Sequence, residues 1–162
     1  MKIIDNFLPE NDFKEIKDLV LGRDFPWFRQ SAIATPEDNE LCYFTHIAYN
    51  NESGGVNSQY WRFFYDKFFK HIKHKTIIRF KVNYYQRTEK IIVNDPHTDY
   101  PEKHKGVILY LNNCDGYTLL NNKKKVDSIE NRLLMFDPSK NHSSTTTTNA
   151  QGRFNINVNY RI

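Results

Sequence analysis

The sequence predicts a mainly β fold with helices near the N-terminus, built as a double-stranded β-helix, or jelly roll. Short apolar or alternating runs, each bounded by a turn signal, follow one another from Thr76 to the end of the chain. Before them, two stretches repeat their apolar residues at helical spacing. The length of 162 residues fits a single domain over 1–162, with helical support over about 9–75 and a β-helix core over about 76–162.

Composition limits the class of protein. The chain has 12 Phe and 10 Tyr, which is typical of a globular core. The N-terminus lacks the apolar run of a signal peptide, and no stretch approaches membrane-spanning length. Cys42 and Cys114 predict neither a disulfide framework nor a paired-cysteine metal site, which fits a reducing cytoplasm. The net charge of +4 leaves a nucleic-acid partner open, although the lysines are scattered.

The first expected elements are a short strand over residues 2–8 and a helix after it. Pro9 opens the helix, where its missing N–H costs nothing. Gly22 is the expected stop. The helix is predicted to pack on a sheet through its apolar residues Phe13, Ile16, Leu19 and Val20.

Two further elements are expected before residue 76. A strand over Leu41–Tyr49 contains His46, which alternates with apolar neighbours and is expected in the core or at an edge. A second helix is expected from Ser58 to about His74, with an apolar stripe of Trp61, Phe64, Tyr65, Phe68 and Ile72. His71 and His74 lie three residues apart, but lysines surround them, so they are expected on a solvated face and not at a metal.

Strands are expected to fill the rest of the chain. Thr76–Tyr85 alternates between two faces, of which the polar one carries Arg79, Lys81, Asn83 and Tyr85. After an extended lead at Ile91–Val93, further strands are expected at 106–111, 117–120, 126–129, 133–136, 143–148 and 154–160. Asp115-Gly116 and Asn121-Asn122 are expected turns.

The last strand predicts a polar lumen inside the β-helix. Arg153, Asn155, Asn157 and Asn159 alternate with Phe154, Ile156, Val158 and Tyr160. Asparagine is a poor strand residue, so a face of three asparagines and an arginine suggests amides that bind a ligand or one another. A solvated edge strand is the alternative interpretation.

A metal site is indicated by His97, Asp99 and His142. Side chains two residues apart on an extended strand point to the same side, and His142 follows His97 by 45 positions. Two imidazoles and one carboxylate form the facial triad that binds Fe(II) and leaves positions open on the opposite face. Arg153 lies 11 positions after His142, where its fork could hold a dicarboxylate. Pairing of Arg153 with a surface acid, Asp127 or Glu130, is the alternative.

His97-x-Asp99, His142 and Arg153, in this order and spacing, resemble the Fe(II)- and 2-oxoglutarate-dependent dioxygenases of the prolyl-hydroxylase-like branch. Within it, the chain is similar to small stand-alone oxygenases encoded by tailed bacteriophages. The resemblance runs over nearly the whole chain, from Ile4–Leu8 through Arg132–Pro138 to the C-terminus. It implies a jelly roll of cupin-like type, with Fe(II), 2-oxoglutarate and O2 as cofactors and co-substrates. It also implies that His97, Asp99 and His142 are the catalytic metal ligands.

The same resemblance implies roles for residues around the co-substrate. Arg153 would bind the distal carboxylate of 2-oxoglutarate, helped by Asn157 on the same strand face. Tyr85 and Tyr110 occupy positions at which family members contact 2-oxoglutarate, although Tyr110 could equally be a core aromatic. The segment from Asn113 to Thr118 departs from the family, because it has one glycine where the hydroxylases usually carry a pair.

The implied activity is hydroxylation of a substrate C–H bond with release of succinate and CO2. A peptidyl (prolyl-type) or amino-acid-like substrate is favoured by the resemblance, and a nucleic-acid substrate remains open because of the basic charge. A non-enzymatic jelly-roll module with a structural metal is a further alternative. So is a zinc or nickel enzyme of cupin type, for which His104 is the only additional histidine nearby. A phage-encoded protein would act in the host cytoplasm. The sequence leaves the oligomeric state open.

Overall fold

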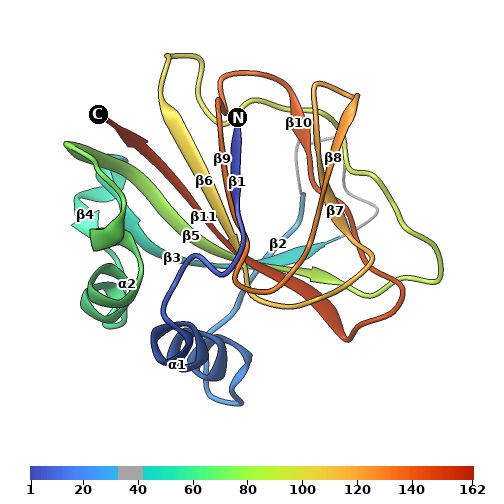
Figure 1. Ribbon diagram of the computed structural model, residues 1–162, viewed down its shortest axis with the longest axis horizontal. Coiled ribbons are helices and arrows are strands. Elements are labelled where there is room, and N and C mark those ends of the chain that lie inside the picture. The colour runs from blue at the N-terminus through green and yellow to red at the C-terminus, as the bar shows by residue number, and fades with distance from the viewer. Residues whose placement is uncertain (33–41) are drawn as a thin grey trace.

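The computed structural model describes residues 1–32 and 42–162, so Leu41 of the predicted strand over Leu41–Tyr49 lies outside it. In the described residues, the strands form two antiparallel sheets (Figure 1). The larger sheet has eight strands: β1 Lys2–Ile4, β2 Phe28–Gln30, β3 Tyr43–Asn50, β4 Gly55–Val56, β5 Thr76–Gln86, β6 Lys105–Tyr110, β9 Leu133–Phe136 and β11 Gly152–Arg161. The smaller has three: β7 Tyr117–Leu120, β8 Lys124–Asp127 and β10 His142–Ser143.

The two longest strands, β5 and β11, lie side by side at the centre of the larger sheet, whose order is β1-β9-β6-β11-β5-β3-β2 with β4 beside β3. Their polar faces are in register. Arg153 is opposite Tyr85, Asn155 opposite Asn83, Asn157 opposite Lys81, and Asn159 opposite Arg79. One polar surface therefore runs along both strands, as the alternation of the sequence predicts.

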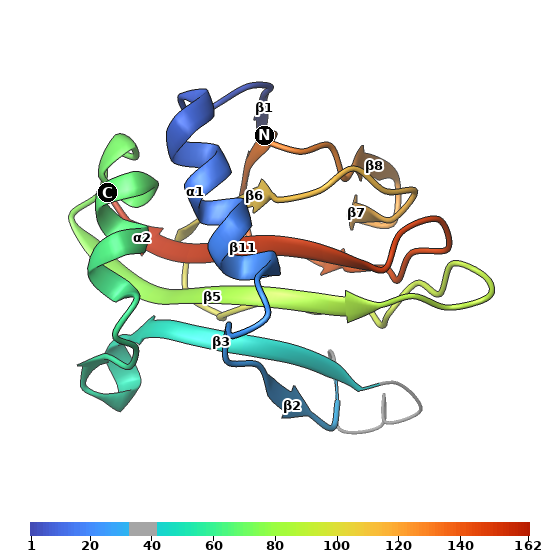
Figure 2. The same ribbon diagram turned by 90° about the horizontal axis from the view of Figure 1, so that it is seen from below.

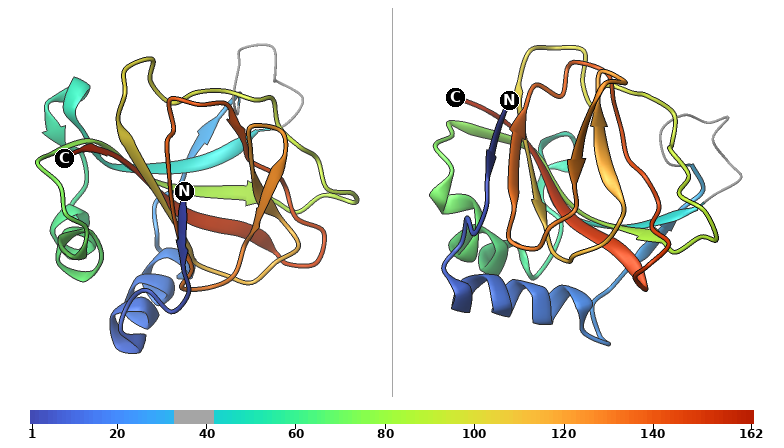
Figure 3. Two further views of the ribbon diagram at one scale, coloured as in Figure 1. Left: turned by 45° about the horizontal axis from the view of Figure 1, so that its top comes forward. Right: turned by 45° about the vertical axis from the view of Figure 1, so that its right-hand side comes forward.

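The smaller sheet stands over one face of the larger sheet, and helix α1 lies against the other (Figures 1 and 3). Asn121 and Asn122 join β7 to β8 with φ angles of 49° and 54°. Asparagine tolerates this left-handed region better than most residues, so it suits the tight hairpin turn predicted there. Two facing antiparallel sheets with helices on one side confirm the mainly β, jelly-roll prediction.

The main hydrophobic core lies between the helices and the larger sheet (Figure 2). Helix α1, Glu10–Leu21, contributes Phe13, Ile16 and Val20, as predicted. The helix ends at Gly22, whose φ of −68° would suit any residue. Glycine is needed there because a Cβ would lie 2.7 Å from the Asp18 carbonyl oxygen. No helix among the described residues combines the length and apolarity needed to cross a bilayer.

The second helix is shorter than predicted. Helix α2 spans Trp61–Lys67 and is followed by a 3₁₀ turn, η2, at Phe69–His71. Phe68 and Phe69 are both fully buried. Consecutive residues of an α-helix point about 100° apart, so the change of geometry at Phe68 lets both rings enter the core. A further 3₁₀ turn, η1, spans Asn51–Ser53.

The sheets also depart from the prediction in two places. The region predicted as helical support, about 9–75, supplies β2, β3 and β4 of the larger sheet, and β1 lies within the strand predicted over 2–8, so the sheet is not confined to residues 76–162. The strand predicted over 143–148 is a two-residue strand followed by single bridges, Thr145 to Val93 and Thr147 to Arg87. Threonine hydroxyls replace part of the ladder: Thr146 Oγ1 accepts from the backbone N–H of Ile92 at 2.9 Å.

The space between the two sheets is divided. One part is apolar and is filled by Ile108, Tyr110, Leu120, Val126, Leu134 and Phe136. The other part is bounded by the polar faces of β5 and β11. It contains buried side-chain atoms without a protein partner among the described residues, including one oxygen each of Asn83 and Asn157. Buried polar atoms of this kind call for a ligand or water, so this part of the lumen is the candidate site.

Candidate metal centre

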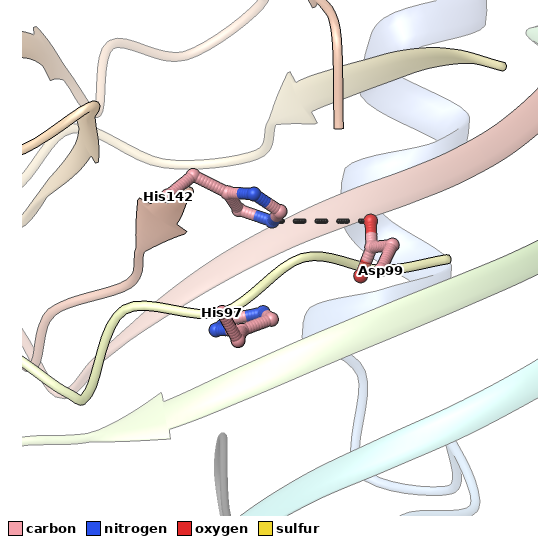
Figure 4. A group of neighbouring side chains, drawn as sticks. All are labelled: His97, Asp99 and His142. Atoms are coloured by element: carbon pink, nitrogen blue, oxygen red, sulfur yellow. Dashed lines mark ion pairs between the residues drawn. The ribbon is translucent and has the colours of Figure 1, made fainter. Parts of the chain in front are cut away.

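His97, Asp99 and His142 come together at the edge of the lumen (Figure 4). His97 and His142 face each other across an antiparallel bridge, in which their backbone N–H groups donate to each other's carbonyls at 3.0 and 2.9 Å. Asp99 is fixed by its N–H, which donates to the Pro138 carbonyl at 3.0 Å. One potential ligand atom from each of the three side chains lies within 4.8 Å of the others.

Both imidazoles present the same nitrogen to this cluster. Nδ1 of His97 lies 3.3 Å from the Asp95 carbonyl oxygen, and Nδ1 of His142 lies 3.0 Å from that of Lys140. A carbonyl only accepts, so each Nδ1 carries a proton and Nε2 is the nitrogen left for a metal. Backbone carbonyls that orient a histidine in this way are typical of metal ligands.

The carboxylate of Asp99 is held from one side only. Arg79 donates from Nη2 to Oδ1 at 3.0 Å, whereas the buried Oδ2 has no hydrogen-bond partner among the described residues and lies 3.9 Å from His142 Nε2. Burial acts to raise the pKa of Asp99, but the charges of Arg79, His142, Lys81 and His97 together outweigh it, and the pKa lies below its usual value. Asp99 is therefore ionised at neutral pH.

The three residues fit a divalent metal ion. Burial, and then the neighbouring His142, lower the pKa of His97, so its ring is neutral at pH 7. The neutral His97 imidazole and the ionised Asp99 carboxylate, with its free oxygen, are in the protonation states that metal binding requires. Three protein ligands of this kind would leave other coordination positions of a bound ion free for exogenous ligands.

Arg153 lies in the same lumen and is almost completely buried, with 1% of its surface exposed. Its Nη2 donates to Thr118 Oγ1 at 2.8 Å and its Nη1 to the Thr145 carbonyl at 3.4 Å, while Nε has no partner in the described chain. No carboxylate among the described residues pairs with it. The alternative of a surface ion pair is wrong, because Arg153 is buried and Glu130 pairs with Lys17 at 2.6 Å.

Tyr85 and Tyr110 lie on either side of Arg153, with ring centroids 5.2 and 5.6 Å from its guanidinium carbon. Tyr85 lines the cavity and Tyr110 does not. The hydroxyl of Tyr110 donates to Thr118 Oγ1 at 2.8 Å, on the atom that also accepts from Arg153. Burial raises the pKa of both tyrosines, so both hydroxyls stay protonated. Tyr110 thus belongs to the apolar part of the lumen and helps to position Arg153 through their shared acceptor, the Thr118 hydroxyl.

A glycine makes room for this arrangement. A Cβ at Gly116 would lie 2.6 Å from the Thr146 carbonyl oxygen and 2.7 Å from Cδ of Arg153. Gly116 is the single glycine of the segment from Asn113 to Thr118, which departs from the family pattern. It lies where the Arg153 side chain passes and where a larger residue would clash.

The cavity joins the metal cluster to Arg153. It is lined by Tyr43, Lys81, Asn83, Tyr85, His97, Asp99, Ile108, Thr118, His142, Ser143, Ser144, Arg153, Asn155 and Asn157. Asn157 is thus in the cavity, as predicted for its strand face. Sequence reasoning missed Thr118, Tyr43 and the roles of Arg79 and Lys81. The polar alternation of residues 79–85 carries the signal for Arg79 and Lys81, whereas the role expected for Tyr85 comes from the family resemblance.

The other histidines lie outside the metal cluster. His46 is buried among aromatic residues and its ring nitrogens contact the Pro26 carbonyl and the Ser58 hydroxyl. His71 is exposed, and His74 contacts the Ile72 carbonyl. His104 is buried, with Nδ1 2.7 Å from the Glu102 carbonyl oxygen. Of the histidines, only His97 and His142 belong to a group that could hold a metal within the described residues.

No protein-family model matches the sequence, and no curated protein is detectably similar to it. Solved structures do share its fold. A prolyl hydroxylase of Trichoplax adhaerens, in complex with a peptide fragment of hypoxia inducible factor, has a TM-score of 0.66 at 19% identity over 99% of this chain and 82% of its own. A 2OG-Fe(II) oxygenase family protein of Burkholderia pseudomallei has a TM-score of 0.66 at 14% identity over 98% and 84%. A prolyl-4-hydroxylase of Pseudomonas putida has a TM-score of 0.61 at 11% identity over 99% and 92%.

At these identities the similarity establishes the fold. The chain has the fold of the 2OG-Fe(II) oxygenases, of the kind found in prolyl hydroxylases, which confirms the resemblance at the level of architecture. A shared fold does not fix the activity, which depends on the residues of the site.

Proposed function

We propose that this protein is an Fe(II)- and 2-oxoglutarate-dependent dioxygenase that hydroxylates a substrate C–H bond and releases succinate and CO2. One observation carries the proposal. A single cavity has a two-histidine, one-carboxylate cluster at one end and, at the other, a buried arginine without a carboxylate partner in the described chain. The fold shared with 2OG-Fe(II) oxygenases supports it.

Different residues of the cavity would bind the metal and the co-substrate. Nε2 of His97 and of His142 and Oδ2 of Asp99 would hold the metal, and Arg79 would keep the Asp99 carboxylate oriented through Oδ1. The guanidinium of Arg153 would take the distal carboxylate of 2-oxoglutarate, with Tyr85 beside it and Asn157 on the same face. Bound Fe(II) and 2-oxoglutarate would supply oxygen activation, in which O2 is consumed and one oxygen atom enters the substrate.

Burial around Arg153 favours a carboxylate ligand. A cation enclosed in protein is costly unless an anion pairs with it, and a planar fork suits the two oxygens of a carboxylate. Thr118 and the Thr145 carbonyl satisfy two donors of the guanidinium but contribute no negative charge. A structural metal site would have no use for such a cation, which argues against the non-enzymatic alternative.

The primary substrate is proposed to be peptidyl or amino-acid-like. The Trichoplax adhaerens protein of the same fold is described with a bound peptide, which supports this class. The basic net charge keeps a nucleic-acid substrate as the second candidate. Free Cys42 and Cys114 fit the reducing setting that Fe(II) needs, and we propose a cytoplasmic protein, in the host cell if it is encoded by a bacteriophage.

The test is an anaerobic calorimetric titration with Mn(II) and then 2-oxoglutarate, followed by succinate measurement with Fe(II) and air. Peptides, free amino acids and nucleotides form the substrate screen, and Asp99→Ala is the inactive control. We expect binding of one metal ion, then of one 2-oxoglutarate, and substrate-dependent succinate. Metal binding without any 2-oxoglutarate binding would contradict the proposal and would favour the alternative, a non-enzymatic jelly-roll module with a structural metal.

A further inference from the structure

Lys81 is a basic side chain of the cavity to which the proposed function gives no role. Burial first, and the neighbouring Arg79 second, lower its pKa from 10.5 to about 7, so a bound anion would favour its charged form. It projects from the polar face of β5, opposite Asn157 of β11, into the cavity that holds His97 and Asp99. Its hydrogen-bond partner is Tyr43, whose hydroxyl accepts from Nζ at 3.4 Å and whose ring centroid lies 5.6 Å from Nζ. Among the described residues, no carboxylate forms an ion pair with Lys81.

Lys81 and Arg153 stand at different levels of the lumen. Tyr85, which pairs with Arg153, is four residues further along β5 than Lys81. At the rise of a strand this separates the two levels by about 13 Å. A 2-oxoglutarate held by Arg153 and by the metal would have both carboxylates engaged. Lys81 is therefore free to bind an anion other than 2-oxoglutarate.

The charges of the cavity point the same way. Among the described residues, Arg79, Arg153 and the charged form of Lys81 are set against a single carboxylate, Asp99, which Arg79 already contacts. A divalent metal and doubly charged 2-oxoglutarate cancel each other and leave this excess of cations unchanged. A substrate with a negative group would balance it, whereas an uncharged peptide segment would not.

The two donors beside the cavity suit a carboxylate. Tyr43 has a raised pKa, because of burial first and the nearby Tyr85 second, so its hydroxyl stays a donor. Its ring stacks on Tyr85 at 5.5 Å and 10°, which fixes the position of the hydroxyl. One ammonium and one hydroxyl can serve the two oxygens of a carboxylate. A doubly charged phosphate is usually held by more donors than these.

We propose that Lys81 and Tyr43 form a second anion subsite, which binds a carboxylate of the primary substrate beside the metal centre. The substrate is then a small carboxylic acid, or a residue with an acidic group close to the oxidised C–H bond. This inference rests on the proposed function, since it takes Arg153 and the metal as the 2-oxoglutarate site.

The experiment uses acetate as the probe and acetamide as its uncharged control. The protein is loaded with Zn(II) and saturating 2-oxoglutarate, and binding of the probe is followed by saturation-transfer NMR of its methyl protons. We expect acetate to bind in the millimolar range and acetamide not to bind. Lys81→Met should weaken acetate binding about tenfold or more, since a charge-assisted hydrogen bond is lost. Tyr43→Phe should weaken it less, and Lys81→Arg should retain most of it.

Two further arms identify the source of the carboxylate. Calorimetry should give Lys81→Met an affinity for 2-oxoglutarate within about twofold of the unaltered protein. The exposed Lys123→Met is the control and should match the unaltered protein in both assays.

Equal losses of 2-oxoglutarate affinity in Lys81→Met and Arg153→Ala would assign Lys81 to the co-substrate and overturn the proposal. Acetate binding that is absent, or unchanged in Lys81→Met, would also overturn it. Phosphate binding more than about tenfold tighter than acetate would overturn the carboxylate class. Acetate binding through Lys81 without 2-oxoglutarate binding would instead overturn the proposed function and leave the subsite standing.

Discussion

Arg153 is a guanidinium enclosed by protein, and its energetics depend on what it binds. Two of its nitrogens donate to Thr118 and to the Thr145 carbonyl, and Nε has no partner in the described chain. Neutral acceptors compensate only part of the cost of removing a charge from water. The residue is therefore expected to gain strongly from an incoming carboxylate.

Arg153→Ala should weaken 2-oxoglutarate binding to the metal-loaded protein by up to about two orders of magnitude. The loss corresponds to a charge-assisted pair of about 2–3 kcal/mol. Arg153→Lys keeps the charge but loses the fork, so its affinity should lie between the two. Calorimetry measures both, with the exposed Arg23→Ala as control. An unchanged affinity in Arg153→Ala would remove this residue from the co-substrate site.

His97→Ala, Asp99→Ala and His142→Ala should each abolish binding of Mn(II) or Fe(II) while the fold persists. Each removes one of three ligands, and none of these side chains belongs to either hydrophobic cluster. Calorimetry reports the metal, and circular dichroism reports the fold. The double variant His71→Ala, His74→Ala is the matched control and should bind metal with unchanged stoichiometry. A reduced stoichiometry in that control would reveal a second site.

At the scale of elements, the segment from Thr145 to Thr148 connects the smaller sheet to Arg153. Asp115 anchors it: Oδ1 accepts from the Thr147 hydroxyl at 2.6 Å and from the Thr148 backbone N–H at 2.9 Å, and Oδ2 accepts from the Thr148 hydroxyl. Desolvation opposes ionisation of Asp115, but these hydrogen bonds together outweigh it and lower its pKa from 3.8 to about 2. The carboxylate therefore stabilises this segment only while it is ionised.

This depressed pKa predicts how stability depends on pH. The contribution of Asp115 should be fully present above pH 3.8 and lost as the pH falls toward 2, because protonation then costs the folded state its acceptor. Asp115→Asn should lower the free energy of unfolding at pH 7 by about 1–3 kcal/mol, and the difference should vanish near pH 2. Urea unfolding of the metal-free protein at a series of pH values measures it, with the exposed Asp24→Asn as control. A deficit that stays constant with pH would show that ionisation is not the cause.

The alternation of β5 and β11 could be read from the sequence because it depends on each strand alone. The same is true of β7, β9 and the turn at Asn121-Asn122, which match their predicted bounds. Thr118 could not be assigned, since its role depends on Tyr110 and Arg153 approaching it from different strands. The end of α2 at Lys67 depends on a core that accepts two adjacent phenylalanines, which local periodicity does not report.

At the scale of the whole molecule, the site connects elements that are distant in sequence. The metal cluster draws on the segment before β6 and on β10, and the cavity adds β3, β5, β6, β7 and β11. Ligands that bind only the folded arrangement stabilise it by mass action. Metal and co-substrate should therefore raise the stability of the entire fold.

Mn(II) at 100 times its dissociation constant should stabilise the protein by about 2.7 kcal/mol, and 2-oxoglutarate should add a further increment. For a domain of this size, each kcal/mol raises the melting temperature by about 2–4 °C. Differential scanning fluorimetry should show both steps in the unaltered protein. Arg153→Ala should retain the metal step and lose most of the second, and Asp99→Ala should lose both. A second step that persists in Arg153→Ala would place 2-oxoglutarate elsewhere.

The register of β5 against β11 also has a consequence for how this protein can change. On each strand, the residues that build the helix-covered core alternate with those that line the cavity. A variant library at Lys81, Asn83, Asn155 and Asn157 would alter ligand preference while Phe80, Val82, Ile156 and Val158 continue to specify the fold. New substrate preferences would then be accessible by single substitutions along two strands, which makes these four positions the first choice for directed evolution of the site.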